Sequence, residues 1–204
     1  MNFTINDIPE SIAASMRSKA VWTPECPVPI EHLKLIEISH YDFAGDIKEG
    51  QMIVLDKISE SVIKIFTELF ARSLQVHSIK LMDEFNGDDN LSMAANNSSS
   101  FNFRKIEGST LLSMHSYGLA IDINPVQNPF IMIDEDTHNV RVLPKKSSMF
   151  LNRSNQRAGM AEPIIEIFKK HGLSVWGGNW NNPIDYHHFQ VPREDVAELM
   201  IGIS

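Results

Sequence analysis

Two short segments of this chain contain residue types that can bind a metal ion. In the first, residues 113–122, seven positions separate His115 from Asp122, and Gly118 lies between them. Glycine lets the chain bend and lets backbones approach closely. Asp122 falls within a run of aliphatic residues that is typical of a strand, and a carboxylate there is costly unless it is paired or binds a metal. Asp122 is therefore either an ion-pair partner or a metal ligand.

The second segment, residues 176–190, contains Asp185 followed by two adjacent histidines, His187 and His188. In an extended strand, neighbouring side chains point to opposite faces, so at most one of these histidines enters a given metal site. The alternative for either one is a histidine at the surface or core edge that is hydrogen-bonded to the backbone.

Together the two segments supply two histidines and one aspartate, which is a ligand set for zinc. Catalytic zinc sites keep three protein ligands and leave the fourth position for water. Asp185 precedes His188 by three residues, so a turn can place both at one cleft, where Asp185 can take a proton from that water. Cys26 is the only cysteine, so an intrachain disulfide and a thiolate zinc cluster are both excluded.

The pattern S-x-H-x-x-G-x-A-x-D at residues 113–122, followed by D-Y-H-H-F at residues 185–189, resembles the zinc D-alanyl-D-alanine peptidases. That family includes D-Ala-D-Ala carboxypeptidases, related dipeptidases, and L-alanyl-D-glutamate endopeptidases of phages and bacteria. Hedgehog signalling domains share its fold. The two motifs are specific as a pair, and the resemblance extends from about residue 97 to residue 190.

The resemblance implies a role for each residue of the two motifs. His115, Asp122 and His188 would bind one zinc ion per chain, and Asp185 would be the general base. The resemblance selects His188 over His187 because the family's ligand immediately precedes the aromatic residue. His187 stands where close relatives often have proline.

Residues 99–109 resemble the family segment that carries an arginine which stabilises the reacting carbonyl, and this implies that role for Arg104. The alternative for Arg104 is a solvated surface charge, the usual fate of arginine. Ser113 either holds a metal ligand from behind, as metal sites commonly require, or is an ordinary turn serine. Trp176 and Trp180 either form walls of a substrate groove or simply pack.

The resemblance implies a zinc-dependent metallopeptidase that hydrolyses stem peptides of bacterial peptidoglycan, of the D-Ala-D-Ala carboxypeptidase or L-Ala-D-Glu endopeptidase type. In that mechanism zinc activates water, Asp185 takes the proton and passes it to the leaving amine, and Arg104 helps zinc to stabilise the oxyanion. One alternative is a non-catalytic, zinc-containing module of the same fold that binds peptides or proteins. Another is a closed structural zinc site with His187 as its fourth ligand.

Composition and net charge exclude some classes of protein for this chain and argue against others. The chain has 204 residues, 43% hydrophobic and 22% charged, so a disordered or collagen-like chain is excluded. A net charge of −8 argues against binding nucleic acid or anionic lipid through bulk charge, but not against a local basic site.

Location is harder to predict than chemistry. No apolar run approaches the 18 residues of a membrane span, and the N-terminus lacks the basic start and apolar core of a secretory signal. A cell-wall substrate implies a periplasmic or extracellular protein. The expected absence of a signal leaves three explanations, namely a trimmed chain, release by lysis, or recycling of wall fragments in the cytoplasm.

The strands and helices expected around these residues do not alternate regularly along the chain. This predicts an α+β fold with a mainly antiparallel sheet flanked by helices, as in the hedgehog and DD-peptidase fold. Length predicts a single domain over residues 1–204, with residues 1–30 as a peripheral N-terminal strap. Residues 86–100 are turn-rich and predict a loop. Apolar periodicity predicts helices at 8–16, 56–73, 162–171 and 194–201, strands at 32–43, 51–55, 77–85, 119–124, 173–178 and 187–191, and a hairpin at 131–143.

Overall fold

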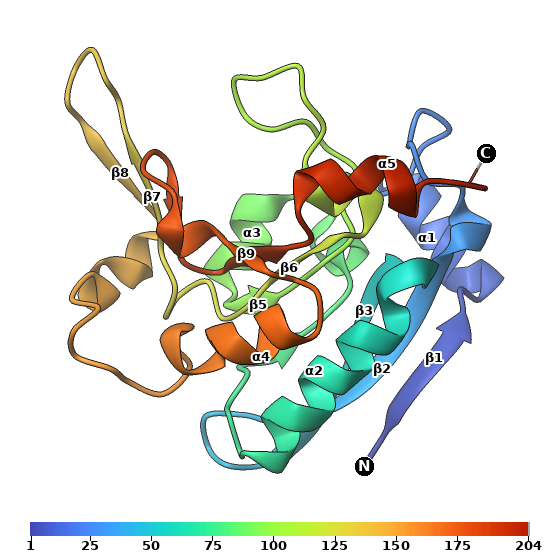
Figure 1. The fold of residues 1–204 in the computed structure, drawn as a ribbon, viewed down its shortest axis with the longest axis horizontal. Helices are drawn as coiled ribbons and strands as arrows, with labels where there is room; N and C mark the ends of the chain where they lie inside the picture. The colour runs from blue at the N-terminus through green and yellow to red at the C-terminus, as the bar shows by residue number, and fades with distance from the viewer. Residues whose placement is uncertain (204) are drawn as a thin grey trace.

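The structure is a computed structural model, and it describes residues 1–203. Its strands form three three-stranded antiparallel sheets and one parallel pair, with helices packed around them (Figure 1). The α+β class is confirmed. The prediction of one mainly antiparallel sheet needs correction, because the strands are short and are divided among separate sheets.

The longest sheet contains the N-terminal strands in the order β1 (Phe3–Asp7), β2 (Leu33–Tyr41) and β3 (Ile47–Leu55). Helix α2 (Ser59–Ala71), which the helical spacing of its apolar residues predicted, packs against β2 (Figure 1). The face of α2 that meets the sheet is fully buried and consists of Val62, Ile65, Phe66 and Leu69.

Residues 1–30, expected as a peripheral strap, also contribute to the sheet and to the core. Strand β1 pairs with β2 along its whole length, and α1 (Glu10–Ser18) buries Met16. In the turn-rich segment that follows, the Sγ atom of Cys26 lies 3.5 Å from the backbone oxygen of Ser116. The N-terminal segment therefore contacts the part of the chain that carries the first candidate metal ligand.

A second sheet brings the two motifs together, in the order β6 (Ala120–Asp122), β11 (His188–Gln190) and β9 (Val175–Trp176). In its register Asp122 lies directly opposite His188. Directly opposed residues in an antiparallel pair have neighbouring side chains. The sheet thus explains how residues 66 positions apart in the sequence come into contact.

The third sheet forms one wall of the molecule's main cleft. Its strands are β10 (Ile184–Asp185), β7 (Phe130–Ile133) and β8 (Val140–Leu143), and β7 and β8 form the predicted hairpin. The hairpin projects from the body at the upper left of Figure 1, and the lime-green loop that follows Arg104 projects near the top centre.

Two predictions between residues 77 and 100 were wrong. The expected strand at 77–85 ends after β4 (Ser78–Ile79), because the Asn97 side chain takes both backbone bonds of Lys80, accepting from its nitrogen and donating to its oxygen. The expected loop contains helix α3 (Asp89–Ala94) and strand β5 (Asn97–Ser98). Asp88 caps α3, since its carboxylate accepts a hydrogen bond of 3.0 Å from the Leu91 nitrogen.

The two C-terminal helices were predicted, and each begins with a 3₁₀ turn. Residues Glu162–Ile164 lead into α4 (Ile165–Lys170), which ends before Gly172, and Arg193–Asp195 lead into α5 (Val196–Leu199). Other 3₁₀ turns are at Ile30–His32, Asp56–Ile58, Met82–Phe85, Met114–Tyr117, Lys145–Phe150 and Gly177–Asn179.

One hydrophobic cluster connects these parts, from Met16 in α1 to Ile203 near the C-terminus. This continuity is the basis on which we propose a single domain for the whole chain. Over residues 1–203, the structure contains no helix that is both long enough and apolar enough to span a bilayer.

Candidate functional site

Three electron-pair donors converge where β6, β11 and the Met114–Tyr117 turn meet. The Nε2 atom of His115 lies 3.2 Å from Oδ2 of Asp122 and 3.2 Å from Nδ1 of His188. Nδ1 of His188 lies 3.0 Å from Oδ1 of Asp122. All three side chains are buried. Among the histidine, cysteine and acidic residues of the described chain, these three lie close enough together to hold one metal ion.

Local structure fixes His115 in this position. Ser113 caps its 3₁₀ turn, because Ser113 Oγ accepts a hydrogen bond of 3.3 Å from the His115 nitrogen. Gly118 ends the turn with a positive φ of 66°, and a Cβ atom there would lie 2.6 Å from the Leu55 nitrogen. That nitrogen donates to the Gly118 oxygen. Only glycine meets both conditions, so the predicted close backbone approach at Gly118 is present.

The ring nitrogens that face away from the cluster have their own partners. Nδ1 of His115 donates to the backbone oxygen of Ser100 over 2.6 Å, and Nε2 of His188 donates to Oε1 of Gln190 over 2.9 Å. With the tautomers assigned from these partners, each neutral ring presents an unprotonated nitrogen to the cluster. Two ring nitrogens and a carboxylate therefore face one another, and they repel unless a cation lies among them.

The donor set fits a zinc ion. Ligand atoms at about 2.0–2.1 Å from zinc in tetrahedral geometry are about 3.3 Å apart. The two ring nitrogens are 3.2 Å apart, and each lies 3.0–3.2 Å from a different oxygen of Asp122. One ligand atom from each residue lies within 4.8 Å of the other two, so the three side chains are close enough to hold such an ion.

The electrostatics of the cluster favour a charged carboxylate at Asp122. Burial acts to raise the pKa of Asp122, but when no metal ion is bound, positive charge on the surrounding rings and the hydrogen bonds that protonated rings donate outweigh it. The pKa of Asp122 is held well below its usual value.

Asp185, the proposed base, lies at the end of β10 and is nearly buried. Its Oδ1 atom faces Nε2 of His187 at 3.0 Å, an ion-pair contact rather than a well-formed hydrogen bond. Burial raises the pKa of Asp185, although neighbouring histidines partly oppose the shift. A Cβ atom on Gly177 would lie 2.6 Å from the Asp185 backbone oxygen and 3.0 Å from its Cβ, so glycine at 177 permits the close packing behind this carboxylate.

His187 lies outside the converging group. Its Nδ1 atom donates to the Asn128 backbone oxygen over 2.8 Å, and its Nε2 atom lies 3.0 Å from Oδ1 of Asp185 and 3.8 Å from Oδ2 of Asp122. Burial lowers its pKa, but these two carboxylates more than compensate and raise it. His187 thus contacts the proposed base, as expected if only one of the adjacent histidines enters the cluster.

Arg104 is fixed by two partners. Its Nη1 atom donates to Ser113 Oγ over 2.7 Å, and its Nη2 atom donates to Oδ2 of Asp89 over 2.8 Å. Burial acts to lower the pKa of Arg104, but the carboxylates of Asp89 and Asp122 act to raise it. The net effect is a raised pKa. The side chain is only 27% exposed, so Arg104 is not the solvated surface charge of the alternative interpretation.

A cleft of about 690 Å³ connects these groups. Every site residue predicted from the sequence lines it except Trp176. Trp180 lies with its ring 5.3 Å from that of His188, whereas Trp176 packs near Tyr186 and Phe189 and donates to the Tyr186 backbone oxygen. The expectation that Trp176 forms a wall of the groove is therefore corrected.

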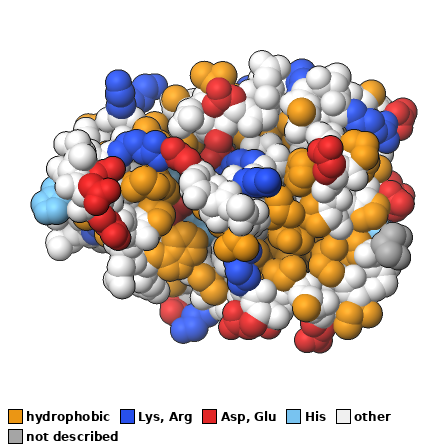
Figure 2. All heavy atoms as spheres, turned by 90° about the horizontal axis from the view of Figure 1, so that it is seen from above, with side chains coloured by type: hydrophobic (Ala, Val, Ile, Leu, Met, Phe, Trp, Pro, Cys, Tyr) orange, Lys and Arg blue, Asp and Glu red, His pale blue; other side chains and the backbone are white. Residues whose placement is uncertain are grey.

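The walls of the cleft combine apolar and charged side chains. The β7–β8 hairpin contributes Phe130, Met132 and Leu143. Arg141 on the same hairpin makes a bidentate ion pair with Glu107 on the opposite loop, at 3.0 and 2.5 Å. Figure 2 views the molecule from the side on which this loop and hairpin project, and hydrophobic, basic and acidic side chains are interspersed on that face.

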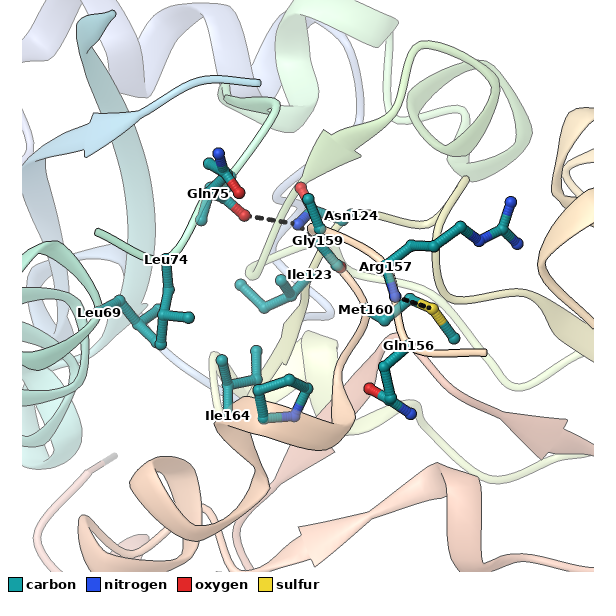
Figure 3. Close-up of a pocket in the computed structure, with 13 residues that line it drawn as sticks. Leu69, Leu74, Gln75, Ile123, Asn124, Gln156, Arg157, Gly159, Met160 and Ile164 are labelled. Carbon is teal, nitrogen blue, oxygen red and sulfur yellow. Dashed lines mark hydrogen bonds between the residues drawn. The ribbon is translucent and has the colours of Figure 1, made fainter. Parts of the chain in front are cut away.

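A second cavity, of about 250 Å³, is lined in part by Ile123 and Asn124, which directly follow β6 (Figure 3). Leu69, Leu74 and Ile164 make it largely apolar, and Asn124 bridges it by donating to the Gln75 backbone oxygen. In Figure 3 the Arg157 side chain extends away from those apolar side chains. No histidine or acidic residue of the described chain lines this cavity, so the metal chemistry belongs to the larger cleft.

Three contributors to the site were missed from the sequence. Gln190 is two residues after His188 in a strand, so period-2 alternation could have placed it on the same face. Asp89 follows the capping residue of a short helix, a signal present in the Asp88–Asp89 pair. Asn128 acts through its backbone oxygen, and no side-chain pattern could have indicated that.

Residues 107–191 match the family model of D-alanyl-D-alanine carboxypeptidase. The match confirms the family resemblance over the segment that contains His115, Asp122, Asp185 and His188. It begins three residues after Arg104, so it does not bear on that arginine. No curated protein and no solved structure matches the chain.

Proposed function

We propose, on the premise that residues 107–191 belong with the D-alanyl-D-alanine carboxypeptidases, that this chain is a zinc-dependent peptidase of peptidoglycan stem peptides. Its reaction would be of the D-Ala-D-Ala carboxypeptidase or the L-Ala-D-Glu endopeptidase type. The observation that carries the proposal is the convergence of His115, Asp122 and His188 on one point of a cleft large enough for a short peptide.

His115, Asp122 and His188 would hold the zinc ion, one per chain. The ion would supply Lewis-acid activation of a water molecule and of the scissile carbonyl. The contacts of His115 with Ser100 and of His188 with Gln190 support this role, because they orient each ring and fix which nitrogen is free to bind metal.

Asp185 would move the proton. Burial raises the pKa of this carboxyl, which suits a group that accepts a proton from water and later donates it to the leaving amine. Arg104 would place its guanidinium against the carbonyl oxygen as negative charge develops there. The pairing of Arg104 with Asp89 and Ser113 supports this, because it fixes the guanidinium before substrate arrives.

The test is the substitution Asp185→Asn, assayed with defined muropeptides and product identification by mass spectrometry. This change keeps size and polarity but removes the ability to accept a proton. We expect peptidase activity to fall by about 10²–10⁴-fold, with zinc content and Tm close to those of the unsubstituted protein. Asp136→Asn, an exposed aspartate in the β7–β8 loop, is the matched control and should leave activity unchanged.

Each other outcome has a definite meaning. Loss of zinc in Asp185→Asn would make Asp185 a ligand, and full activity with zinc retained would place the base elsewhere. If the unsubstituted protein binds zinc but cleaves no wall peptide at any pH tested, the peptidase proposal is wrong. The non-catalytic peptide- or protein-binding module would then be the better interpretation.

A further inference from the structure

Two of the basic side chains that line the cleft lack an acidic partner. Arg104 is paired with Asp89, and Arg141 is paired with Glu107. Lys105 and Arg193 also line the cleft, and neither makes an ion pair with any residue between 1 and 203. Both residues are exposed, so in a chain with a net charge of −8 their positive charges at the cleft are available to a ligand.

Both unpaired cations border the same short segment of the wall. Nη2 of Arg193 donates to the Leu112 backbone oxygen over 3.3 Å, and Lys105 faces Leu112 across an antiparallel bridge. Ser113 is the next residue, and its hydroxyl accepts from Arg104. The unpaired cations are therefore one residue along the wall from the arginine proposed to contact the reacting carbonyl.

The remaining hydrogen-bonding capacity of these side chains suits a carboxylate. A guanidinium has five N–H donors in a planar fork and an ammonium has three, whereas only one of the eight, on Arg193, has an assigned protein acceptor. Glu194 also lines the cleft and makes no ion pair among the described residues, so Lys105, Arg193 and Glu194 together leave one positive charge in excess.

We propose that Arg193 and Lys105 form a subsite that binds a carboxylate group of the peptide substrate beside the reacting carbonyl. The inference rests on the proposed peptidase function and extends it to substrate selection. A carboxylate next to the scissile bond has two sources in this substrate class, namely the C-terminus of the peptide and the side group of an acidic residue within it. The first would make the enzyme a carboxypeptidase and the second would favour internal cleavage.

The test measures binding rather than turnover. Full-length, zinc-loaded Asp185→Asn protein is titrated by calorimetry with two matched pairs of probes. The first pair is acetyl-D-Ala-D-Ala and its C-terminal amide, and the second is acetyl-L-Ala-D-Glu amide and acetyl-L-Ala-D-Gln amide. Within each pair the probes differ in one carboxylate, which is terminal in the first pair and internal in the second.

We expect the acid to bind about 10- to 100-fold more tightly than its neutral partner in one pair, as is typical of a charge-assisted contact. Adding Arg193→Gln and Lys105→Gln should abolish that preference and leave the Kd of the neutral probe unchanged. Lys57 and Lys64 are exposed and lie outside the cleft. Adding Lys57→Gln and Lys64→Gln instead removes the same amount of charge and should leave the preference for the acid unchanged.

Two results would overturn the subsite, namely equal binding within both pairs, or a preference that survives loss of Arg193 and Lys105. Whichever pair shows the preference identifies the source of the carboxylate. Failure of the proposed function is distinguishable, because a protein that shows the preference but cleaves no wall peptide with Asp185 intact retains the subsite and loses the peptidase assignment.

Discussion

At the scale of single residues, the adjacent histidines His187 and His188 differ in the partner of one ring nitrogen. Gln190 takes the Nε2 proton of His188 and leaves its Nδ1 free for the metal cluster, whereas the Asn128 backbone oxygen takes the Nδ1 proton of His187. The other ring nitrogen of His187, Nε2, faces Asp185 and not the cluster. The division of roles thus follows from which atoms lie behind each ring, and this geometry gives a physical reason for the choice of His188 that the family resemblance implied.

This assignment predicts graded effects on zinc binding. His115→Ala removes a ligand, so the purified protein should fall from about one zinc equivalent per chain to little or none by elemental analysis. Gln190→Ala removes only the partner behind His188, so zinc affinity should fall by about 10- to 100-fold, as is typical of such supporting contacts. A His115→Ala protein that keeps its full zinc content would disprove the ligand set.

Arg104 is predicted to act on the transition state. Arg104→Ala should lower kcat by about 10²–10³-fold, by analogy with the loss of one oxyanion donor, with a smaller change in KM. Arg104→Lys should recover only part of the rate, because a point charge cannot contact Ser113, Asp89 and the substrate in one plane. Steady-state kinetics on one muropeptide decide this, and unchanged turnover in Arg104→Ala would assign Arg104 a structural role.

At the scale of elements, the turn Gly177–Asn179 supports strand β10 from behind. Gly177→Ala should push Asp185 out of position, because the added methyl group would meet the Asp185 backbone at 2.6 Å. We expect kcat to fall by about tenfold or more with zinc content unchanged. Gly178→Ala is the control in the same turn, since its methyl group would meet the Trp176 ring instead, and it should reduce stability more than turnover.

Elements with a strong repeating pattern were predictable, and those formed by side-chain hydrogen bonds were not. The apolar spacing of α2 and the alternation in β2 were sufficient to place those elements, and the two motifs were sufficient to select His115, Asp122 and His188. Strand β4 ends early because the Asn97 amide takes the backbone bonds of Lys80. Asn97 and Lys80 are 17 positions apart, so their contact has no local signature in the sequence. The contact between Asp89 and Arg104 has none for the same reason.

At the scale of the whole molecule, His40 in β2 makes stability sensitive to acid. Its side chain is buried at 4% exposure, and neither ring nitrogen has a hydrogen-bond partner among the described residues. Burial lowers its pKa, although Asp42 and Glu49 oppose the shift and His77 adds to it. The unfolded chain therefore binds a proton that the folded protein excludes, and stability falls as the pH drops below about 6.5 towards the lowered value.

The measurement is the free energy of unfolding in urea at pH 7.5 and at pH 5.5. His40→Gln cannot titrate, so it should lose less stability between these two pH values than the unsubstituted protein. His138→Gln, at an exposed position, is the control and should show the unsubstituted dependence. An identical pH dependence for all three proteins would contradict the role of His40.

Cys26 provides a chemical reporter of how the N-terminal segment holds the site. Burial raises the pKa of its thiol to about 11, so the folded protein contains almost no thiolate at neutral pH. The thiol also points at the backbone of Ser116, next to His115. Alkylation at neutral pH should then be slow while this segment is in place and faster when it moves away from the His115 turn, and zinc binding should slow it if both depend on the same closed arrangement. A single cysteine thus allows the opening of the metal site to be timed in solution.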